Sequence, residues 1–557
     1  MKRTAAAVFI LFSVASTLTA SESSRYIVAM KRGESNIQAA AMIRDIETTA
    51  ARDVRTFSIV DGFAATLTAE EAATLRRQAG VDYVERVSIR YAFGASALMP
   101  SLDETRNLAG QTVPYGIDAV RARDLWQHTR GANINVAVID TGLDYTHPDI
   151  AGVYAGGYNA IRKNNDPRDD NSHGTHVSGT IGAADNSIGV VGVAPAVRLW
   201  SVKVLGADGT GSTEHIIAGL DWVVKKKAEV GGNWVVNLSL GAGDTNVAEE
   251  QAFKRGVDAG LLIVSASGNG SEEGRPAPVS YPAAYPGVVA VGAIDSANRV
   301  ANFSNQGPEL ALVAPGVGVL STVRVASVQL SIVSNGSDVF SGRPLDGSKK
   351  GDVSGEFVNC GVGRQTDFPA AVSGRIAVIQ RGGTRADGER ITFAEKARNA
   401  KAAGATAVVI YNNDASAISW TLVDPADPST QSFDWPVTIG VTRADGEKLI
   451  ARPGLTLTVT NRDDDYAQYN GTSMASPHVA GIAALVWSLA PTAPASDVAA
   501  AITSTAIDLG TAGYDFTFGN GAADALNAAK KLAPTVFALP GEPDPNPSGR
   551  RTLRRGR

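Results

Sequence analysis

The strongest constraint on the fold is an alternation of strand-like and helical segments between about residues 111 and 323. The strand-like runs are short, apolar and rich in valine and isoleucine. Strands that alternate with helices in this way predict a parallel sheet with helices on both faces. The runs are Asn135 to Ile139, Arg198 to Val204, Trp234 to Leu240, Leu261 to Ser265 and Val288 to Val291.

Two polar residues come just after such runs. Asp140 follows the first run directly, and Asn269 follows the fourth within a Ser-Gly-Asn-Gly segment. Chemistry in parallel α/β sheets gathers beyond the carboxyl ends of the strands. We therefore expect a functional site at this edge of the sheet.

Three motifs place one reactive residue each, in a fixed order along the chain. Asp140 lies in Val-Ala-Val-Ile-Asp-Thr-Gly, His173 opens His-Gly-Thr-His-Val-Ser-Gly, and Ser473 lies in Gly-Thr-Ser-Met-Ala-Ser-Pro-His. Acyl transfer needs a nucleophile, a base that takes its proton, and donors for the developing oxyanion. The order Asp, His, Ser is one in which such a triad occurs, and agreement at three motifs is a specific signal.

Each of these residues has an expected role. Ser473 opens a helix, where free N–H groups favour nearby negative charge, and Gly471 permits a tight turn before it. His173 is the expected base and then acid, and Asp140 would fix its tautomer. Asn269 would donate to the oxyanion, although an Asn-Gly pair alone would indicate only a turn.

With these motifs the chain resembles subtilisin-like serine proteases. The resemblance implies a substrate cleft between the segments Val202 to Gly211 and Asn237 to Gly241, where an extended peptide lies as an added strand. Gly270 stands where some members carry an acidic residue, and Gly241, Gly268 and Ser280 are small. We therefore expect broad specificity with a preference for large apolar or aromatic side chains in the first pocket. The implied substrate-binding residues are Leu205, Gly209, Ser239, Leu240, Gly241, Ala266, Ser267, Gly268 and Ser280.

The resemblance also implies a structural Ca²⁺ site. Asp149 and the loop from Ala184 to Val190 match the family's high-affinity calcium loop. Calcium takes carboxylate, amide and carbonyl oxygens. The implied ligands are the side chains of Asp149 and Asn186 and the carbonyls of Ala184, Ile188 and Val190; the alternative is a solvated loop.

The N-terminal region predicts export and self-inhibition. Lys2 and Arg3 precede an apolar run, and residues 1–21 are typical of a signal peptide; the run is too short and too interrupted for a membrane anchor. Residues 24–93 follow a β-α-β-β-α-β pattern with a capping-box start at Thr68. This pattern resembles the family's inhibitory propeptide, the alternative being an unrelated small α+β domain.

Residues 324–462 break the α/β alternation and resemble a protease-associated (PA) domain, a β-rich insertion. The resemblance rests on a strand within 374–382, a helix near 393–403 and a strand within 405–411. The catalytic domain then comprises residues 111–323 and 463–535, and the basic, proline-containing segment 540–557 is expected to be disordered. Cys360, the single cysteine, has no catalytic motif around it and can form no internal disulfide.

These features predict a secreted, extracellular serine endopeptidase of the subtilisin-like α/β class, made as a self-processing zymogen with a ferredoxin-like propeptide. Its expected partners are protein and peptide substrates and its own propeptide. A net charge of -5 gives no basic excess that would suggest nucleic-acid binding, and no membrane association is expected after signal removal. The competing hypothesis is a non-catalytic binding protein that keeps the fold and works through the PA segment.

Overall fold

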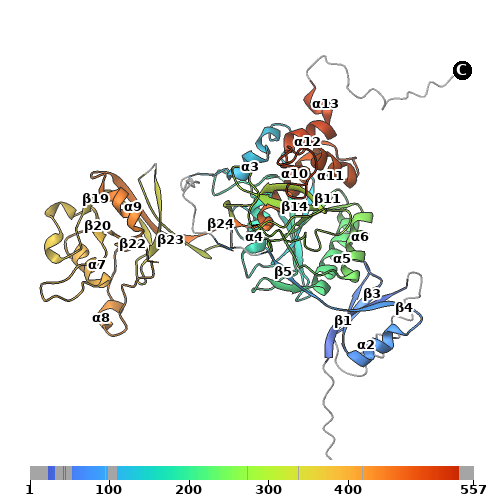
Figure 1. Cartoon of the computed structure of the whole chain (residues 1–557), viewed down its shortest axis with the longest axis horizontal. Helices are drawn as coiled ribbons and strands as arrows, with labels where there is room; N and C mark the ends of the chain where they lie inside the picture. Colours follow the sequence, from blue (N-terminus) through green and yellow to red (C-terminus); the bar gives the residue numbers. More distant parts are fainter. Residues whose placement is uncertain are drawn as a thin grey trace, which may run out of the picture. The chain divides into compact units, whose positions relative to one another are not determined.

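The computed structural model describes residues 23–31, 42, 44, 53–93, 96–97, 110–272, 274–335, 338–416 and 418–538. It divides into two compact units, one up to Ser88 and one from Ile89 onward (Figure 1). The predicted signal peptide, most of the first predicted helix of the propeptide and the C-terminal tail lie outside the described residues.

The first unit has the strand order expected of a ferredoxin-like propeptide. The strands β1 (Ser23–Met30), β2 (Arg55–Phe57), β3 (Gly62–Thr68) and β4 (Val81–Arg86) form an antiparallel sheet in the order β2-β3-β1-β4. Helix α2 (Ala69–Arg76) begins at the predicted capping box: the Glu71 N–H donates to Thr68 Oγ1 at 3.2 Å, and the Thr68 N–H donates to Glu71 Oε2 at 2.7 Å. The predicted second helix and last strand are therefore confirmed.

The second unit is built on a seven-stranded sheet in the order β15-β14-β13-β11-β7-β9-β8, and every strand pair in it is parallel. All residues of β7, β11 and β13 are buried, as expected for a parallel sheet covered on both faces. The five predicted runs are confirmed as strands; β8, with two glycines, and β15 were not among them. The bounds are β7 (Asn135–Asp140), β8 (Tyr154–Asn159), β9 (Arg198–Lys203), β11 (Trp234–Leu238), β13 (Leu261–Ala266), β14 (Val288–Ile294) and β15 (Leu310–Pro315).

Helices flank this sheet. The almost entirely buried helix α10 (Thr472–Leu489) packs on β11, β13, β14 and β15 and against α4 (His173–Gly182), α11 (Ala495–Ser504) and α12 (Ala525–Leu532). Helices α5 (Thr213–Val230) and α6 (Val247–Asp258) pack together, α5 contacting β7 and β8 and α6 contacting β13 (Figure 1). The shorter helices are α3 (Tyr115–Ala119), η1 (Arg123–Leu125) and α13 (Pro534–Phe537). Among the described residues, no helix combines the length and apolar character that crossing a bilayer requires.

The second unit also contains two small three-stranded sheets. In one, β5 (Ile89–Ala92) is the middle strand between β10 (Thr210–Ser212) and β12 (Leu240–Gly241). In the other, β24 (Tyr466–Asn470) is the middle strand between β16 (Val319–Thr322) and β6 (Ser96–Ala97). Strand β24 ends just before Gly471, so this second sheet leads directly into the serine motif.

The inserted segment forms a closed barrel in the order β17-β18-β22-β21-β20-β19-β23. Its first and last strands pair along their length, so that Val328 lies opposite Asp464 and the barrel begins and ends at one place. The strands are β17 (Val328–Ser334), β18 (Val339–Pro344), β19 (Gly351–Asn359), β20 (Ile376–Gln380), β21 (Ala407–Tyr411), β22 (Val437–Val441) and β23 (Thr456–Asp464). The helices are η2 (Gln365–Asp367), η3 (Ala370–Val372), α7 (Phe393–Ala402), α8 (Pro428–Gln431) and α9 (Arg443–Ile450).

Candidate active site

The end of strand β7 and the start of helix α4 bring Asp140 and His173 together. Asp140 Oδ1 lies 2.7 Å from His173 Nδ1 and also accepts the Thr141 N–H at 2.7 Å. Both side chains are buried. Because the contact uses Nδ1, it leaves Nε2 of His173 for other chemistry.

The charges around His173 favour its protonated form. Burial lowers the pKa of His173, but the adjacent Asp140 carboxylate and the more distant Asp169 outweigh that effect, and the net shift is upward. Asp169 is buried and accepts from Thr141 Oγ1 at 2.9 Å and from Thr175 Oγ1 at 2.6 Å. The sequence analysis did not single out Asp169, since it lies in an irregular segment outside the three motifs.

Ser473 is the second residue of α10, and Asn269 lies beside it. Asn269 Oδ1 accepts the Thr472 N–H at 2.9 Å and the Thr472 hydroxyl at 2.8 Å, which fixes the orientation of its amide. Asn269 Nδ2 then donates to the carbonyl of Phe93 at 3.2 Å, and the Ser473 hydroxyl lies 3.1 Å from the same oxygen. The serine and the asparagine therefore converge on one peptide carbonyl.

Gly471 is required where these groups meet. Its φ is +154°, and a Cβ atom there would lie 3.1 Å from Asn269 Nδ2 and 3.3 Å from the Phe93 carbonyl oxygen. A side chain at this position would crowd both the donor and the carbonyl. The predicted tight turn before Ser473 thus has a specific steric reason.

Among the described residues, no hydrogen bond joins Ser473 to His173. The serine hydroxyl is within reach of the carbonyls of Ser239, at 2.9 Å, and Phe93, and His173 Nε2 is buried without a hydrogen-bond partner. Rotation about χ1 of Ser473 would move its hydroxyl away from these two carbonyls.

The chain itself supplies an extended peptide in the expected cleft. Strand β5 pairs antiparallel with β10 on one side and with β12 on the other. The Ala92 N–H donates to the Gly209 carbonyl at 2.9 Å, and the Phe93 N–H donates to the Ser239 carbonyl at 3.3 Å. The two segments named from the sequence therefore enclose an added strand, as expected.

One residue expected to form the first pocket, Gly241, lies against Phe93, and others are hydrogen-bonded to one another. A Cβ atom on Gly241 would lie 2.7 Å from Phe93 Cζ, which locates the ring against this glycine. The Ser280 N–H donates to the Ser267 carbonyl at 2.8 Å. Asn305, which the sequence analysis missed, donates from Nδ2 to Ser280 Oγ at 3.1 Å. Of the remaining expected residues, Leu205, Leu240, Ala266 and Gly268 are buried in or beside these segments.

The loop expected to bind calcium is folded around Asp149. This buried carboxylate accepts from Asn186 Nδ2 at 3.0 Å, the Val190 N–H at 2.9 Å and the Tyr466 hydroxyl at 2.9 Å. A Cβ atom on Gly189, whose φ is +53°, would lie 2.3 Å from Asp149 Oδ2. Ile188 is linked to the group through its N–H, which donates to Asn186 Oδ1 at 3.2 Å.

Gln111 joins this loop and was not predicted. Its Nε2 lies 2.8 Å from the Ala184 carbonyl, 3.2 Å from the Val190 carbonyl and 3.3 Å from Asn186 Oδ1. Three of the expected ligand oxygens, those of Ala184, Asn186 and Val190, thus lie around the Gln111 side-chain amide. The oxygen of that amide could itself serve as a ligand. One carboxylate with amide and carbonyl oxygens is a donor set that suits Ca²⁺.

Three other buried side chains, those of His176, His478 and Cys360, lie in environments that favour a structural role. His176 Nε2 is bonded to the carbonyls of Val319 and Ala467, and burial lowers its pKa to about 3. His478 Nδ1 is bonded to the Met474 carbonyl at 2.8 Å, and burial lowers its pKa to about 4. Burial raises the pKa of the free Cys360 thiol to about 12, so it is no nucleophile at neutral pH.

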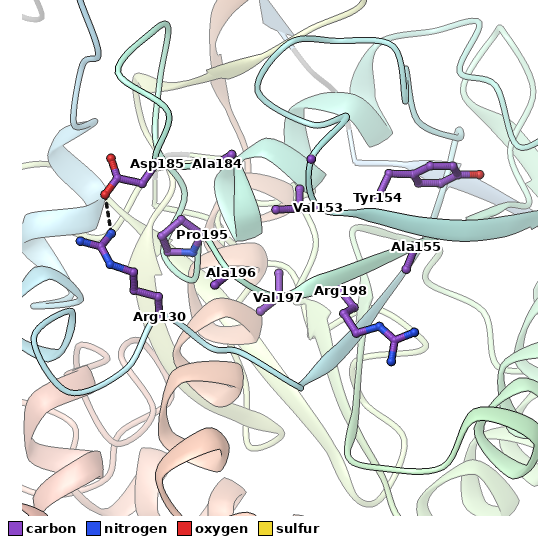
Figure 2. Close-up of a pocket in the computed structure, with 11 residues that line it drawn as sticks. Arg130, Val153, Tyr154, Ala155, Ala184, Asp185, Pro195, Ala196, Val197 and Arg198 are labelled. Carbon is purple, nitrogen blue, oxygen red and sulfur yellow. Dashed lines mark hydrogen bonds and ion pairs between the residues drawn. The ribbon is translucent and has the colours of Figure 1, made fainter.

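A surface pocket of about 660 Å³ borders the loop expected to bind calcium, through Ala184 and Asp185 (Figure 2). It is lined by the starts of β8 and β9 and by Arg130 and Asp185, which form an ion pair. Asp140 lies at the opposite, carboxyl end of the parallel strands. Its lining contains none of the candidate residues Asp140, His173, Asn269 and Ser473, and the chain's own strand β5 lies between the segments expected to form the cleft.

Comparisons with known proteins agree with this geometry. Residues 131–339 match the model of the subtilase family, residues 353–449 that of the PA domain, and residues 25–92 that of the peptidase inhibitor I9 family. The chain is 37% identical to subtilisin E of Bacillus subtilis over 316 residues, which cover 56% of this chain and 77% of that protein. It is 46% identical to subtilisin BL of Lederbergia lenta over 215 residues, covering 38% and 75% of the two chains.

The chain is also similar to solved structures of subtilisin-like proteases. A psychrophilic subtilisin-like protease from an Antarctic Pseudoalteromonas matches with a TM-score of 0.52 and 32% identity, covering 77% of this chain and 100% of that one. Fervidolysin from Fervidobacterium pennivorans matches with a TM-score of 0.58 over 92% of this chain and 62% of that one; at 21% identity it adds a likeness of fold.

Proposed function

Since the chain belongs to the subtilase family of serine proteases, we propose that it is a secreted endopeptidase that is made as a self-processing zymogen. One observation carries this proposal. The carbonyl of Phe93, in the chain's own cleft-bound strand, lies 3.1 Å from the Ser473 hydroxyl and 3.2 Å from Asn269 Nδ2. A carbonyl held between a nucleophile and an oxyanion donor is poised for acyl transfer.

In the proposed reaction, Ser473 Oγ attacks the carbonyl carbon of the scissile bond and passes its proton to His173 Nε2. The Asp140 carboxylate stabilises the resulting imidazolium through the contact at Nδ1. Asn269 Nδ2 donates to the oxyanion, together with the N–H of Ser473, which lies in the first turn of α10 and has no acceptor within the helix. The imidazolium then gives its proton to the leaving amine, and water releases the acyl group by the same steps in reverse order.

The first pocket is proposed to take large apolar or aromatic side chains. Phe93 already occupies this position in the chain's own strand, against Gly241. Small residues line the pocket, and none of the pocket residues described above is acidic. Burial of an aromatic side chain contributes ~25 cal/mol for each Å² of apolar surface removed from water.

Self-processing is proposed to occur after Phe93, the last residue of the predicted propeptide. The bond between Phe93 and Gly94 is the one whose carbonyl faces Ser473. Beyond this bond the backbone of β6 pairs with β24, Ser96 opposite Asn470. The chain is thus held on both sides of the proposed cleavage position, upstream by β10 and β12 and downstream by β24.

Calcium is proposed to stabilise the loop around Asp149. Asp149, Asn186 and Gln111 would supply side-chain oxygens, and Ala184, Ile188 and Val190 would supply carbonyls. When bound, the ion would neutralise the buried Asp149 carboxylate and tie the loop to the segment at Gln111. No step of the proposed chemistry depends on it.

Covalent labelling tests the function directly. Incubation with a fluorophosphonate should label the mature protein at Ser473, and the Ser473→Ala variant, expressed in a host that lacks other proteases, should stay unlabelled and uncleaved. The culture medium should contain the processed protein with its new N-terminus at Gly94. A folded, processed protein that never reacts would favour the competing binding-protein hypothesis instead.

A further inference from the structure

One arginine of the cleft-bound strand is completely enclosed. Arg90 lies in β5, three residues before Phe93, and its side chain has 0% exposure. Its neighbours Ile89 and Tyr91 are 55% and 48% exposed. Of these three side chains, the cleft therefore encloses only that of Arg90.

The guanidinium has a partner for each of its five N–H groups. Nε lies 3.2 Å from both oxygens of Glu249, and Nη2 donates to Glu249 Oε2 at 2.7 Å and to the Asp244 carbonyl at 3.0 Å. Nη1 donates to Asp244 Oδ1 and to the Ile89 carbonyl, both at 3.0 Å. A lysine ammonium, with three donors at one point, could not replace this planar arrangement.

The acidic partner is built into the catalytic domain. Glu249 is fully buried in the first turn of α6, where its own N–H donates to Asn246 Oδ1 at 3.0 Å. The Tyr285 hydroxyl lies 3.0 Å from Glu249 Oε2. The helix start and this hydroxyl hold the carboxylate in place, but among the residues that the structure describes only Arg90 forms an ion pair with it.

We propose that Glu249, assisted by Asp244, makes the fourth substrate position before the cleaved bond selective for arginine. This inference rests on the proposed function, since it assumes that substrates bind as Ile89 to Phe93 do. An apolar side chain in the same place would bury the Glu249 carboxylate without a counter-charge, which is strongly unfavourable. The preferred substrates would then carry arginine three residues before a large apolar or aromatic residue.

Peptide cleavage by the mature enzyme, matured from the full chain, tests this proposal. An internally quenched peptide with the sequence Ile-Arg-Tyr-Ala-Phe-Gly-Ala-Ser is compared with peptides carrying norleucine, lysine or glutamate in place of arginine. Leaving a buried charge unpaired predicts a loss in kcat/KM of about 30-fold or more for norleucine. Glutamate should be poorer still and lysine intermediate. Equal rates for arginine and norleucine would overturn the proposal.

Two substitutions in helix α6 test whether Glu249 is the residue that selects arginine. Glu249→Gln should reduce the preference for arginine over norleucine by about tenfold or more, because a charged hydrogen bond becomes a neutral one. Glu250→Gln makes the same change at the adjacent, exposed position and should leave the preference intact. An unchanged preference in a correctly titrated Glu249→Gln enzyme would exclude Glu249 as the selecting residue.

The two proposals can fail separately. If Glu249→Gln does not mature, the peptide series on the unsubstituted enzyme still decides the question. If no peptide is cleaved and a fluorophosphonate does not label Ser473, the proposed function and this inference both fail. If Ser473 is labelled and the peptides are cleaved without regard to the fourth residue, only the arginine preference is wrong, and Arg90 serves to hold the propeptide.

Discussion

The active-site edge and the inserted barrel both bury a lysine, and they stabilise it differently. Lys203, at the end of β9, donates to the carbonyls of Thr141 and Leu205 and to the Asp170 carboxylate, each at 2.6 to 2.8 Å. Lys396, in α7 of the barrel, donates to the carbonyls of Val362, Gln380 and Gly382. Burial lowers the pKa of Lys396 to about 8.

Both lysines use all three donors on protein acceptors, and they differ in that only Lys203 has a carboxylate among its three hydrogen-bond partners. All three donors of Lys396 are used within the barrel, so nothing is left for a ligand. At the active-site edge, by contrast, His173 Nε2 and Asp140 Oδ2 are buried without a hydrogen-bond partner among the described residues. Unused polar atoms in a buried pair of titratable groups are expected at a catalytic site.

The largest effect is expected at the ion pair. Asp140→Asn keeps the shape of the side chain but removes the charge and favours the wrong imidazole tautomer. We expect kcat to fall by about 10⁴-fold, as for this change in other triads. Steady-state peptide hydrolysis after active-site titration measures it. A loss in kcat of less than tenfold would show that the buried charge of Asp140 is structural, like that of Lys396 in the barrel.

The second largest effect on activity is expected from substitution of Asn269, the proposed oxyanion donor. Asn269→Ala removes the donor at 3.2 Å from the Phe93 carbonyl and should lower kcat by about 10²–10³, the size known for this donor in subtilisin. The Michaelis constant should change little, because the contact strengthens in the transition state. If KM rose and kcat stayed constant, Asn269 would bind the ground state instead.

Calcium removal should affect stability and not the chemical step. An ion bound only by the folded state stabilises by about 2.7 kcal/mol at a hundredfold excess over its Kd. The melting temperature of Ser473→Ala protein is measured with calcium, with magnesium and with chelator, since this background prevents self-digestion. We expect a rise with calcium that Asp149→Asn abolishes. An identical melting temperature in chelator would contradict the assigned loop.

The pH profile should follow His173. Its pKa is raised in the folded protein, and the base must be neutral to accept a proton. The value of kcat/KM should therefore rise with pH through a midpoint above 6.5, the ordinary value, and fall about tenfold per pH unit below it. Asp169→Asn should move the midpoint to lower pH. A midpoint below 6.5 in the unsubstituted enzyme would show that burial, and not Asp140, dominates.

The smallest effect on the hydrolysis of small peptides is expected from deletion of the barrel. Joining Ser327 to Asp465 by a short linker removes it at the paired ends of β17 and β23. Hydrolysis of small peptides should change by no more than about twofold, as for distant independent sites. Cleavage of large folded proteins should change instead, because we expect the barrel to control access. Equal losses for both substrate types after titration would show that the barrel supports the active site.

The motifs allowed the candidate catalytic groups to be placed in the fold because each lies at the end of a regular element. Asp140 ends an apolar strand, and His173 and Ser473 open helices, so the local pattern defined their places. Residues that act through distant contacts carried no such signal. Arg90 and Glu249 are 159 positions apart, and Gln111 meets the calcium loop 73 positions later at the Ala184 carbonyl. Their roles depend on the fold and could not be seen in any short segment.

The pairing of Val328 with Asp464 has a consequence for how such chains diversify. Because the barrel leaves and re-enters the catalytic domain at neighbouring backbone positions, the remaining chain can close across the gap with little loop entropy. A gene could therefore gain, lose or exchange this module without moving any strand of the catalytic sheet. Substrate range could then evolve by recombination, while the residues that break the peptide bond stay unchanged.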